Sequence, residues 1–407
     1  MGLDGIDEPI QNQPMKILFN LGVFGKHGVE HALINILPQL RVPNSQIYLH
    51  EIYEPDYPSP LLEKIKDFTV HICSLPRHSF WGNIHMNRRK NLIYKFIDGL
   101  GIFNIHSIVS KKINKFEVDV VVDYDLSLLR SANKIKSPII GVFHFRPKNF
   151  RSGNSSKLKR IGERLRSYKK LIVLCPEMLK EACEVWPYLA DKFVVLPNSI
   201  DIQKIDKNSK QVIHLPEGVQ ANEYFLTIAR LTHQKNISLM LEAFHHAKQQ
   251  GCDWKLIIIG EGEDKNELIA KSNKLGIGSQ AIFMGYQENP YPFIKLSGAF
   301  ISSSREEGFP VSLIEAISLS CPIVALACPT GPTDILENGL LGSLVPFTED
   351  NPNQLAQAMT EISRNQDLKN SYKIKMKDKS DKYSSIKLGK DFSDLITSCC
   401  KNENINC

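Results

Sequence analysis

The sequence has no long apolar run and no pattern of paired cysteines. No window of its 407 residues approaches the roughly 18 uninterrupted apolar residues of a membrane-spanning helix, and the polar, acidic start (Asp4, Asp7, Glu8) is unlike a signal peptide. The nine cysteines are odd in number and form no Cys-x-x-Cys pair, which argues against a disulfide framework and against a zinc site. We therefore expect a cytoplasmic protein with reduced thiols.

Other signatures are also missing. The glycines Gly22, Gly25 and Gly28 match neither the dinucleotide fingerprint nor a Walker loop, since no Gly-Lys-Ser/Thr is present. No aromatic-interleaved basic motif appears, so we do not expect nucleic acid as a partner. The content of 42% hydrophobic and 23% charged residues is that of an ordinary globular protein, and it excludes collagen, coiled coil and wholesale disorder.

Charge is distributed unevenly along the chain. Residues 1–205 carry 29 basic and 20 acidic residues, whereas residues 206–407 carry 21 and 24. The stretch 146–170 holds ten basic residues against the single acid Glu163, and 86–116 holds seven against Asp98. Such stretches usually form a solvated face, but they also suit an anionic acceptor or anionic lipid headgroups. We predict peripheral contact with an anionic membrane, on the inner face of the cell membrane, and keep the other two interpretations as alternatives.

Short β-branched runs alternate with helical stretches over the whole length, which predicts an α/β protein with two doubly wound parallel sheets. A length of 407 residues also favours two domains. The strands are expected at 17–23, 118–122, 138–143, 171–174 and 193–196, and, after a polar linker at 198–217, at 224–228, 255–259, 281–284, 299–302, 323–327 and 343–345. The expected parts are a disordered extension (1–14), an N-terminal Rossmann-like domain (15–205), a C-terminal one (206–385), and a terminal helix and tail (386–407) that crosses back to the first domain.

Ligands of doubly wound sheets bind beyond the carboxyl ends of the strands, so candidate residues were sought in those loops. The strongest constellation follows the expected strand at 299–302. Gly308 lies in a loop, and Pro310 stands where a helix would begin. The free backbone N–H groups of Val311, Ser312 and Leu313 would then form a phosphate site at the helix N-terminus.

Two carboxylates flank this helix start. Glu307 precedes it and Glu315 lies about one and a half turns inside it. Because a turn separates them, they are not expected to flank one glycosidic bond as in a glycosidase. We expect them to contact different parts of one extended ligand, the alternative being a helix-start acid and a surface glutamate.

Cations and a histidine follow other strands. Arg230 and Lys235 stand after one strand and before a helix, an arrangement that suits a diphosphate, although a solvated basic turn is the alternative. His144 directly follows the apolar run 138–143 and is either a cleft residue or a structural, buried histidine.

Together these segments resemble the C-terminal half of family 4 of the glycosyltransferases, which have the GT-B fold. The resemblance is carried by ARLTHQKN, LIIIGEGEDKNEL, IFMGY, SSSREEGFPVSLIEAISLSCPIVA and CPTGPTDIL. Glu307 and Glu315 match the family's Glu-x7-Glu motif. The first half adds KILFNLGVFGKHGVEHALIN, DVVVDYDLSLL, IIGVFHF and LIVLCPEMLKE…DKFVVLPNSID, so the resemblance covers nearly all of the chain after Met15.

The resemblance implies a role for each matched residue. Arg230 and Lys235 would neutralise the diphosphate of the sugar donor, Glu315 would bind the ribose and Glu307 the transferred sugar. His144, with Glu307, Lys235 and Arg230, is implied to act in catalysis. The other implied substrate-binding residues are Gly22 and Gly28 under the diphosphate, Met284, Gly285 and Tyr286 around the base, and Gly308, Phe309, Pro310, Val311 and Ser312 at the sugar and phosphates.

The resemblance further implies a retaining, metal-independent hexosyltransferase. It would move a sugar from a nucleotide sugar, a UDP-sugar being favoured over a GDP-sugar, to a glycan or lipid-linked glycan in lipopolysaccharide or capsule synthesis. No metal and no cofactor is expected; Asp123-Tyr124-Asp125, the one match to a metal motif, is interpreted as a cleft loop. Two alternatives remain open: another GT-B enzyme such as an epimerase or phosphorylase, and a non-enzymatic sugar-nucleotide-binding protein.

Overall fold

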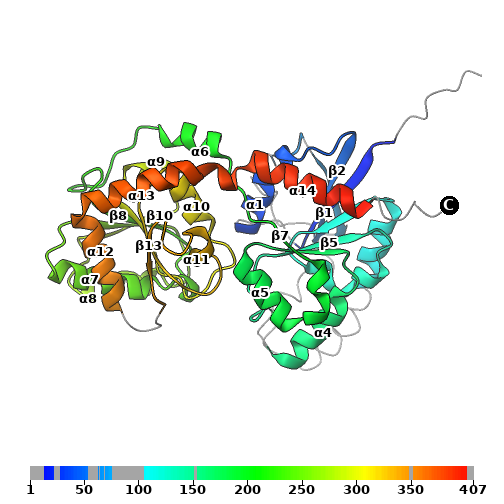
Figure 1. Ribbon diagram of the computed structural model, residues 1–407, viewed down its shortest axis with the longest axis horizontal. Helices are drawn as coiled ribbons and strands as arrows, with labels where there is room; N and C mark the ends of the chain where they lie inside the picture. The colour runs from blue at the N-terminus through cyan, green and yellow to red at the C-terminus, as the bar shows by residue number, and fades with distance from the viewer. Residues whose placement is uncertain are drawn as a thin grey trace, which may run out of the picture.

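The computed structural model describes residues 13–22, 28–53, 63, 65–67, 69–75, 105–150, 154–347 and 352–400. Two parallel sheets, each with its own helices, stand side by side (Figure 1). This confirms the predicted α/β class with two doubly wound domains. Of the expected N-terminal extension, residues 1–12 lie outside the described residues, and residues 13 and 14 have no regular structure.

The N-terminal sheet has seven parallel strands in the order β3-β2-β1-β4-β5-β6-β7. The strands are β1 (Met15–Leu21), β2 (Ser45–Tyr53), β3 (Thr69–Leu75), β4 (Val120–Asp123), β5 (Ile139–Phe143), β6 (Lys170–Val173) and β7 (Phe193–Val195). The sequence analysis missed β2 and β3, because polar residues such as His50 and Glu51 interrupt their apolar pattern. The strand order reverses between β1 and β4, and ligands of open α/β sheets bind beyond the carboxyl ends at such a point.

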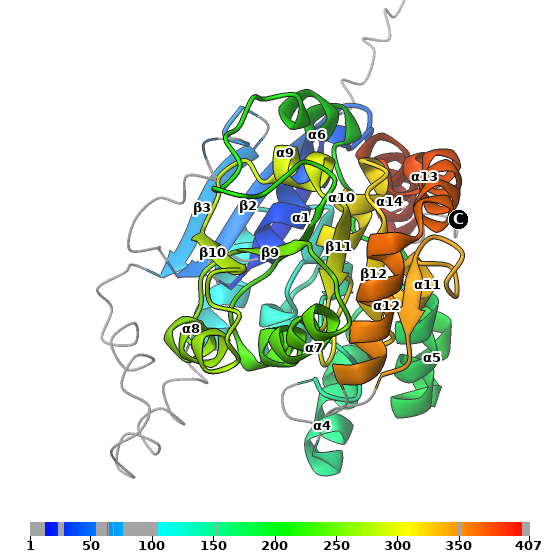
Figure 2. The same ribbon diagram turned by 90° about the vertical axis from the view of Figure 1, so that its left-hand side faces the viewer.

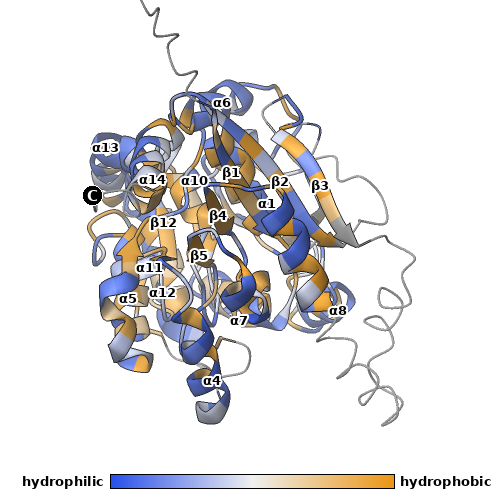
Figure 3. Cartoon of the chain, turned by 90° about the vertical axis from the view of Figure 1, so that its right-hand side faces the viewer, coloured by the Kyte–Doolittle hydropathy of each residue, from blue (hydrophilic) through white to orange (hydrophobic). Residues whose placement is uncertain are grey.

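Helices cover both faces of this sheet. They are α1 (Gly28–Ile36), a helical stretch at 105–115, α4 (Ser155–Leu165) and α5 (Pro176–Val185), with short 3-10 turns η1 (Leu37–Gln39), η3 (Ser127–Arg130), η4 (Ala132–Lys134) and η5 (Pro187–Lys192). Figure 3 shows apolar β4 and β5 inside the domain and a largely hydrophilic α4 at its periphery. The Asn154 side chain caps α4 by accepting from the Ser156 N–H at 3.0 Å.

The C-terminal sheet has six parallel strands in the order β10-β9-β8-β11-β12-β13. They are β8 (Tyr224–Ile228), β9 (Lys255–Ile259), β10 (Ala281–Gly285), β11 (Ala299–Ser302), β12 (Ile323–Leu326) and β13 (Ser343–Val345). The helical elements are η6 (His233–Lys235), α7 (Ile237–Gln249), α8 (Lys265–Lys274), α9 (Tyr291–Leu296), α10 (Val311–Ser318), α11 (Pro332–Ile335), α12 (Pro352–Arg364), α13 (Gln366–Lys379) and η7 (Ser380–Tyr383). Figure 2 looks onto this domain, in which α7 and α12 pack side by side.

The expected linker at 198–217 contains a helix, α6 (Ile202–Ser209), which packs on α9 and α10 of the second domain. The expected domain boundary between residues 205 and 206 therefore falls inside a helix. The sequence analysis missed α6 because the polar composition of this stretch favoured a linker.

The last described helix, α14 (Ser385–Cys400), returns to the first domain, as Figure 1 shows in red. Its Phe392 ring meets Phe19 edge-on with centroids 6.0 Å apart, and the Arg41 N–H donates to Ser393 Oγ at 2.7 Å. The two segments that connect the domains also pair with each other. The Ile200 N–H donates to the Tyr383 carbonyl oxygen and the Ser385 N–H to that of Ile200, both at 2.9 Å. No described helix is long and apolar enough to cross a membrane.

Candidate functional site

A cavity of about 770 Å³ lies between the two domains, within the range of small-molecule binding sites. The N-terminal domain contributes α1, the second domain contributes α9, α10 and the end of β10, and α6 closes one side. The lining includes His31, Ile34, Asn35, Asp201, Lys204, Ile205, Asn208, Gln211, Met284, Gln287, Asn289, Tyr291, Val311 and Glu315. Three residues selected from the sequence, Met284, Val311 and Glu315, therefore meet in one cavity.

Together with Asp201 and Glu288, Glu315 is one of the carboxylates that line this cavity. The Tyr291 hydroxyl donates to its Oε1 at 3.2 Å, and the surrounding protein, by removing water, raises the pKa of Glu315 to about 7. Near neutral pH the group accordingly changes between a hydrogen-bond donor and a pure acceptor. Tyr291 was missed by the sequence analysis, since a tyrosine at the start of a short helix carries no signal of its own.

The second centre is an ion pair between Lys235 and Glu307. Lys235 Nζ lies 2.5 Å from Glu307 Oε1, and the Ser304 hydroxyl donates to the same oxygen at 2.6 Å. The two side chains are 19% and 8% exposed, so the pair is largely removed from water. The sequence analysis assigned these residues to different parts of a ligand; here each neutralises the other. Neither residue lines the cavity that holds Glu315.

The loops that carry this pair are tied together. The Gln234 side-chain amide donates to the Glu306 carbonyl oxygen at 3.0 Å, and the Arg305 N–H donates to the Gln234 carbonyl oxygen at 2.9 Å. The Ser303 hydroxyl reaches the carbonyl oxygens of Lys235 and Asn236, both at 3.0 Å. Since the loop after β8 and the loop after β11 are joined in this way, the ion pair sits on a rigid support.

Arg230 differs from Lys235 in its exposure. It lies exposed after β8, and within the described part of the chain its guanidinium makes one contact, a long hydrogen bond of 3.4 Å to Gln234 Oε1. An exposed guanidinium with so weak a contact can turn toward a phosphate.

The helix α10 begins one residue after the predicted start, with Pro310 at the N-cap and Val311 as the first helical residue. The prediction that the Leu313 amide is free is wrong, because this N–H donates to the Pro310 carbonyl oxygen at 3.0 Å and closes the first turn. Ser312 is partly exposed. The Phe309 ring is buried and packs on Tyr383 with centroids 5.7 Å apart, so it contacts the connecting segment.

His144 and Gly308 bring the two domains into contact. A Cβ atom on Gly308 would lie 2.0 Å from the His144 carbonyl oxygen, so the two backbones approach as closely as a glycine allows. The His144 ring is buried against Tyr124, with centroids 4.9 Å apart, and its Nε2 has no hydrogen-bond partner in the described part of the chain. Burial lowers the pKa of His144 to about 4, which keeps the ring neutral.

The glycine loop of the first domain is described only at its ends, since residues 23–27 lie outside the described residues. The Gly22 N–H donates to Asp125 Oδ2 at 2.9 Å, and a Cβ on Gly22 would lie 3.2 Å from that oxygen. Gly28 is the first residue of α1, and a Cβ there would meet no atom within 4 Å.

Asp123, the first residue of the Asp-x-Asp match, belongs to the core of the first domain. It is fully buried and accepts from the Tyr168 hydroxyl at 2.6 Å, from the Asn20 amide at 2.9 Å and from the Leu128 N–H at 3.1 Å. Three donors thus occupy its oxygens, and the role of this side chain is to hold the loop after β4 in place.

The three residues expected around the base follow one another at the end of β10 and differ in exposure. Met284 lines the cavity, whereas the Tyr286 side chain is 70% exposed. Gly285 has φ +68°, and a Cβ on it would lie 2.8 Å from Glu261 Oε1. The glycine is therefore needed for the backbone turn after β10.

Further contacts join the domains across the cleft. Arg146 Nη1 lies 3.8 Å from Glu306 Oε2, and the Asn149 amide donates to the same oxygen at 2.5 Å. The Thr330 N–H donates to Glu177 Oε2 at 3.0 Å. These residues were not selected from the sequence, because nothing in a single strand-loop-helix pattern indicates a partner on another domain.

Comparison with known proteins finds that the second domain is similar to glycosyltransferases. Residues 210–379 match the family model described as Glycosyl transferases group 1. The chain is 29% identical over 200 residues to the N-acetylgalactosamine-N,N'-diacetylbacillosaminyl-diphospho-undecaprenol 4-alpha-N-acetylgalactosaminyltransferase of Campylobacter jejuni. The aligned residues make up 49% of this chain and 52% of the relative. Over 141 residues the chain is 35% identical to the lipopolysaccharide 1,6-galactosyltransferase of Salmonella typhimurium, covering 33% and 38%. The chain thus spans about a third to a half of the length of these relatives.

Solved structures are similar over nearly the whole chain. HepE of Anabaena in complex with UDP-glucose superposes with a TM-score of 0.74 at 17% identity, covering 94% of this chain and all of that one. A variant of Staphylococcus aureus TarM, in complex with Fondaparinux, alpha-GlcNAc-glycerol and UDP, superposes with a TM-score of 0.72 at 14% identity, covering 95% and 100%. The predicted GT-B fold is confirmed.

Proposed function

We propose that this protein is a glycosyltransferase that moves a sugar from a nucleotide sugar to a glycan or lipid-linked glycan in the synthesis of a surface polysaccharide. The observation that carries the proposal is the cavity between the domains, in which Glu315, Val311 and Met284 meet in a GT-B fold. UDP and UDP-glucose occupy structures of similar fold, which favours a UDP-sugar. We further propose that the protein belongs to family 4 of the glycosyltransferases, whose Glu-x7-Glu motif is formed here by Glu307 and Glu315.

Within this proposal the cavity takes the nucleoside. The ionised Glu315 carboxylate, held by Tyr291, accepts hydrogen bonds from the ribose hydroxyls. The first turn of α10 and the exposed Arg230 face the diphosphate, where the helix dipole and the guanidinium both favour negative charge.

The ion pair serves the sugar and the leaving group. Glu307, fixed by Ser304, accepts hydrogen bonds from sugar hydroxyls, while Lys235 beside it stabilises the charge that develops on the leaving diphosphate. His144 contributes an uncharged ring with an open Nε2 at the domain contact. Lys235 and Arg230 together can stabilise the leaving diphosphate without a metal ion, and for this reason we propose metal-independent transfer.

The proposed stereochemical course is retention. The bond from the anomeric carbon to the diphosphate oxygen breaks, the acceptor oxygen bonds to that carbon on the same face, and the acceptor proton passes to the departing phosphate oxygen. No side chain is needed as a nucleophile, in agreement with the involvement of Glu307 in the ion pair with Lys235.

Membrane contact forms part of the proposal. Ile161 and Leu165 turn the apolar face of α4 into the domain, and Lys159, Arg160 and Arg164 are exposed on the opposite face. A basic face of this kind attracts anionic headgroups, with each charge near the surface worth about 1 kcal/mol. The enzyme would then act from the cytoplasmic side on an acceptor carried by a lipid.

A panel of nucleotide sugars tests the proposal. Purified protein is incubated with each sugar nucleotide, with and without a glycan acceptor, and free UDP or GDP is measured beside the sugar product. Release of UDP from one UDP-sugar, accelerated by an acceptor, is the expected result. Interconversion of the sugar without release of nucleotide would identify an epimerase, and tight binding without turnover would identify a binding protein; either would contradict the proposal.

A further inference from the structure

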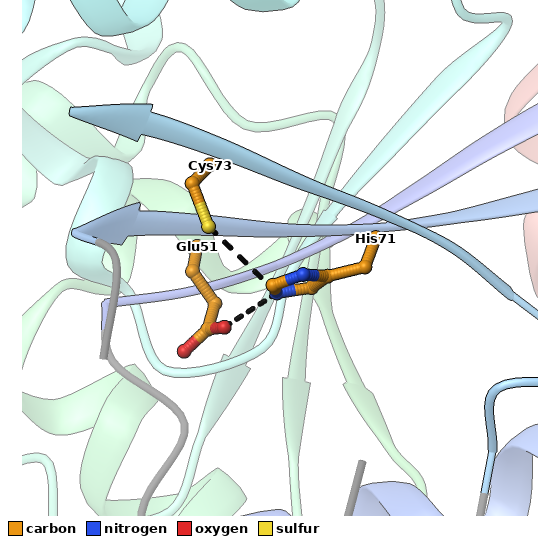
Figure 4. A group of neighbouring side chains, drawn as sticks. All are labelled: Glu51, His71 and Cys73. Atoms are coloured by element: carbon orange, nitrogen blue, oxygen red, sulfur yellow. Dashed lines mark hydrogen bonds and ion pairs between the residues drawn. The ribbon is translucent and has the colours of Figure 1, made fainter. Parts of the chain in front are cut away.

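One cluster of chemically active side chains lies away from the cavity and the ion pair. Glu51 on β2 and His71 and Cys73 on β3 bring one oxygen, one nitrogen and one sulfur within 4.8 Å of one another (Figure 4). Within the described part of the chain, this is the one group of three or more such side chains that converge so closely. The proposed transfer reaction makes no use of it.

The strand register brings these side chains together. Parallel pairing sets Glu51 opposite Cys73 and Leu49 opposite His71. Successive side chains on a strand point to opposite faces, so Glu51, Cys73 and His71 all lie on one face of the sheet. The register therefore fixes which positions face one another, and the side-chain conformations bring the three ligand atoms within 4.8 Å.

The local geometry centres on a single nitrogen. His71 Nε2 lies 2.5 Å from Glu51 Oε2 and 3.8 Å from Cys73 Sγ. A ring nitrogen carries one proton or one lone pair, so it cannot serve both neighbours with a good hydrogen bond. The three atoms lie within 4.8 Å of one another, a separation that a single bound ion can span.

The set of ligand atoms indicates which ion. One thiolate, one imidazole and one carboxylate are typical zinc ligands, and bond lengths of about 2.0–2.3 Å place tetrahedral ligands about 3.3–3.6 Å apart. The separation of 3.8 Å between His71 and Cys73 is close to this value. The distance of 2.5 Å between His71 Nε2 and Glu51 Oε2 would have to increase by about 0.8 Å. The His71 side chain is 39% exposed, so its ring has space to move by this amount.

We propose that Glu51, His71 and Cys73 form a binding site for a divalent cation of borderline softness, in the first place Zn²⁺. The carboxylate, Nε2 and the thiolate supply three ligands, and the exposed side of His71 leaves the fourth position to water. Binding displaces the thiol proton and the Nε2 proton that His71 shares with Glu51, and both are released to solvent as the metal bonds form. The sequence analysis expected no zinc site because it searched for cysteines close in sequence, whereas these ligands lie on different strands.

Such a site would fasten the edge of the N-terminal sheet. Among the residues that the structure describes, β3 pairs on one side only, with β2, so the metal would add a second link between these strands. An ion that binds only the folded protein raises its stability with concentration. We expect Zn²⁺ to raise the melting temperature at concentrations that leave a variant without the cysteine unaffected.

Cobalt is the probe that tests the site, because a thiolate ligand gives Co²⁺ a charge-transfer absorption that oxygen and nitrogen ligands do not. The full chain is purified without a metal-affinity tag, reduced, treated with chelator and titrated with Co²⁺. We expect this absorption to saturate at one ion per chain and to disappear when Zn²⁺ displaces the cobalt. Cys73→Ser should abolish it, and His71→Ala should weaken cobalt binding at least tenfold.

Cys183→Ser is the matched control, because Cys183 is also a partly buried cysteine but lies on α5. Its cobalt absorption should equal that of the unmodified chain. Circular dichroism checks the fold of every variant, and Cys73→Ala replaces Cys73→Ser if the serine variant unfolds. Absence of the absorption from the unmodified chain at saturating Co²⁺ would overturn the proposal, as would its persistence in a folded Cys73 variant; a hydrogen-bonded triad without a metal role would then remain.

Discussion

The carbonyl oxygen of His144 lies 2.0 Å from the point where a side chain on Gly308 would begin, so the two domains meet through a contact that has room for hydrogen alone. A Cβ atom cannot occupy this position unless one backbone moves away. The contact joins the end of β5 to the loop that carries Glu307, and it therefore holds both sides of the cleft in register.

Gly308→Ala should consequently separate the domains at the cleft. We expect transfer from the sugar donor to fall at least about tenfold, which corresponds to about 1.4 kcal/mol in the transition state. Thermal melting should change little, because each domain keeps its own core. Gly276→Ala is the control, since this glycine follows α8, away from the domain contact, and a Cβ there meets no atom within 4 Å; its positive φ lowers stability but leaves transfer unchanged. Full activity in a folded Gly308→Ala protein would show that the contact is unimportant in solution.

Glu307→Gln should lower turnover at least about tenfold by removing the charge that Lys235 and Ser304 now hold in place. The amide is of similar size and its oxygen still accepts from Ser304, so the fold should survive. Turnover of the sugar donor and a thermal melt are measured together, with Glu263→Gln, at an exposed position after β9, as the control. If folded Glu307→Gln is fully active, this carboxylate does not belong to the reaction.

Lys235→Ala should lose both stability and turnover. The alanine leaves a largely buried carboxylate with the Ser304 hydroxyl but without a counter-charge, and breaking such a buried pair costs about 3–5 kcal/mol. The double variant Lys235→Ala with Glu307→Gln should therefore melt at a higher temperature than Lys235→Ala alone. Equal melting temperatures would mean that the pair contributes no net charge interaction.

The pKa of Glu315, raised to about 7, predicts a pH dependence of nucleotide binding. An ionised carboxylate accepts ribose hydroxyls better than the acid does, so affinity for UDP should increase as the pH rises through 7. With this pKa the ionised fraction grows about tenfold between pH 6 and pH 8, and affinity should follow it. Calorimetric titration with UDP at both pH values measures the change. In the Glu315→Gln variant, only the ionisation of UDP itself can change the affinity between the two pH values, so this variant is the control. If it shows the same pH dependence as the unmodified protein, Glu315 is not the cause.

The sequence predicted what is local and missed what depends on distant partners. The helix α10 begins at Val311, one residue after the predicted start at Pro310, and the alternation of apolar runs predicted both sheets apart from β2 and β3. The polar residues that hid β2 and β3 are tolerated because the sheet register and neighbouring groups provide partners, as His71 does for Glu51.

The pairing of Lys235 with Glu307 spans 72 positions and requires two neighbouring strands to end side by side. The contact of His144 with Gly308 requires the two domains to be placed relative to each other. Neither can be derived from periodicity or loop composition, since both arise from tertiary arrangement.

Membrane attachment is the last prediction, and it rests on α4. Its exposed residues Lys159, Arg160 and Arg164 face away from the domain, so several charges of about 1 kcal/mol each would act together on an anionic bilayer. Co-sedimentation with vesicles should show binding to anionic lipid at low salt and none to neutral lipid. Binding should vanish at 1 M salt, where the screening length is about 3 Å.

The variant that tests the segment neutralises five basic residues: Lys157, Lys159, Arg160, Arg164 and Arg166. Arg166 pairs with Glu163 at 2.9 Å and lies over the Tyr188 ring, so a second variant that retains Arg166 separates packing from charge. The control for net charge neutralises the three exposed lysines of α13, Lys375, Lys377 and Lys379, and is compared with an α4 variant that neutralises Lys159, Arg160 and Arg164 alone. All the variants reduce the total charge of the protein. If only the α4 variants lose binding, the contact therefore lies on α4. Equal binding to both kinds of lipid, or equal loss with the α13 control, would contradict a specific contact and leave α4 as a solvated face.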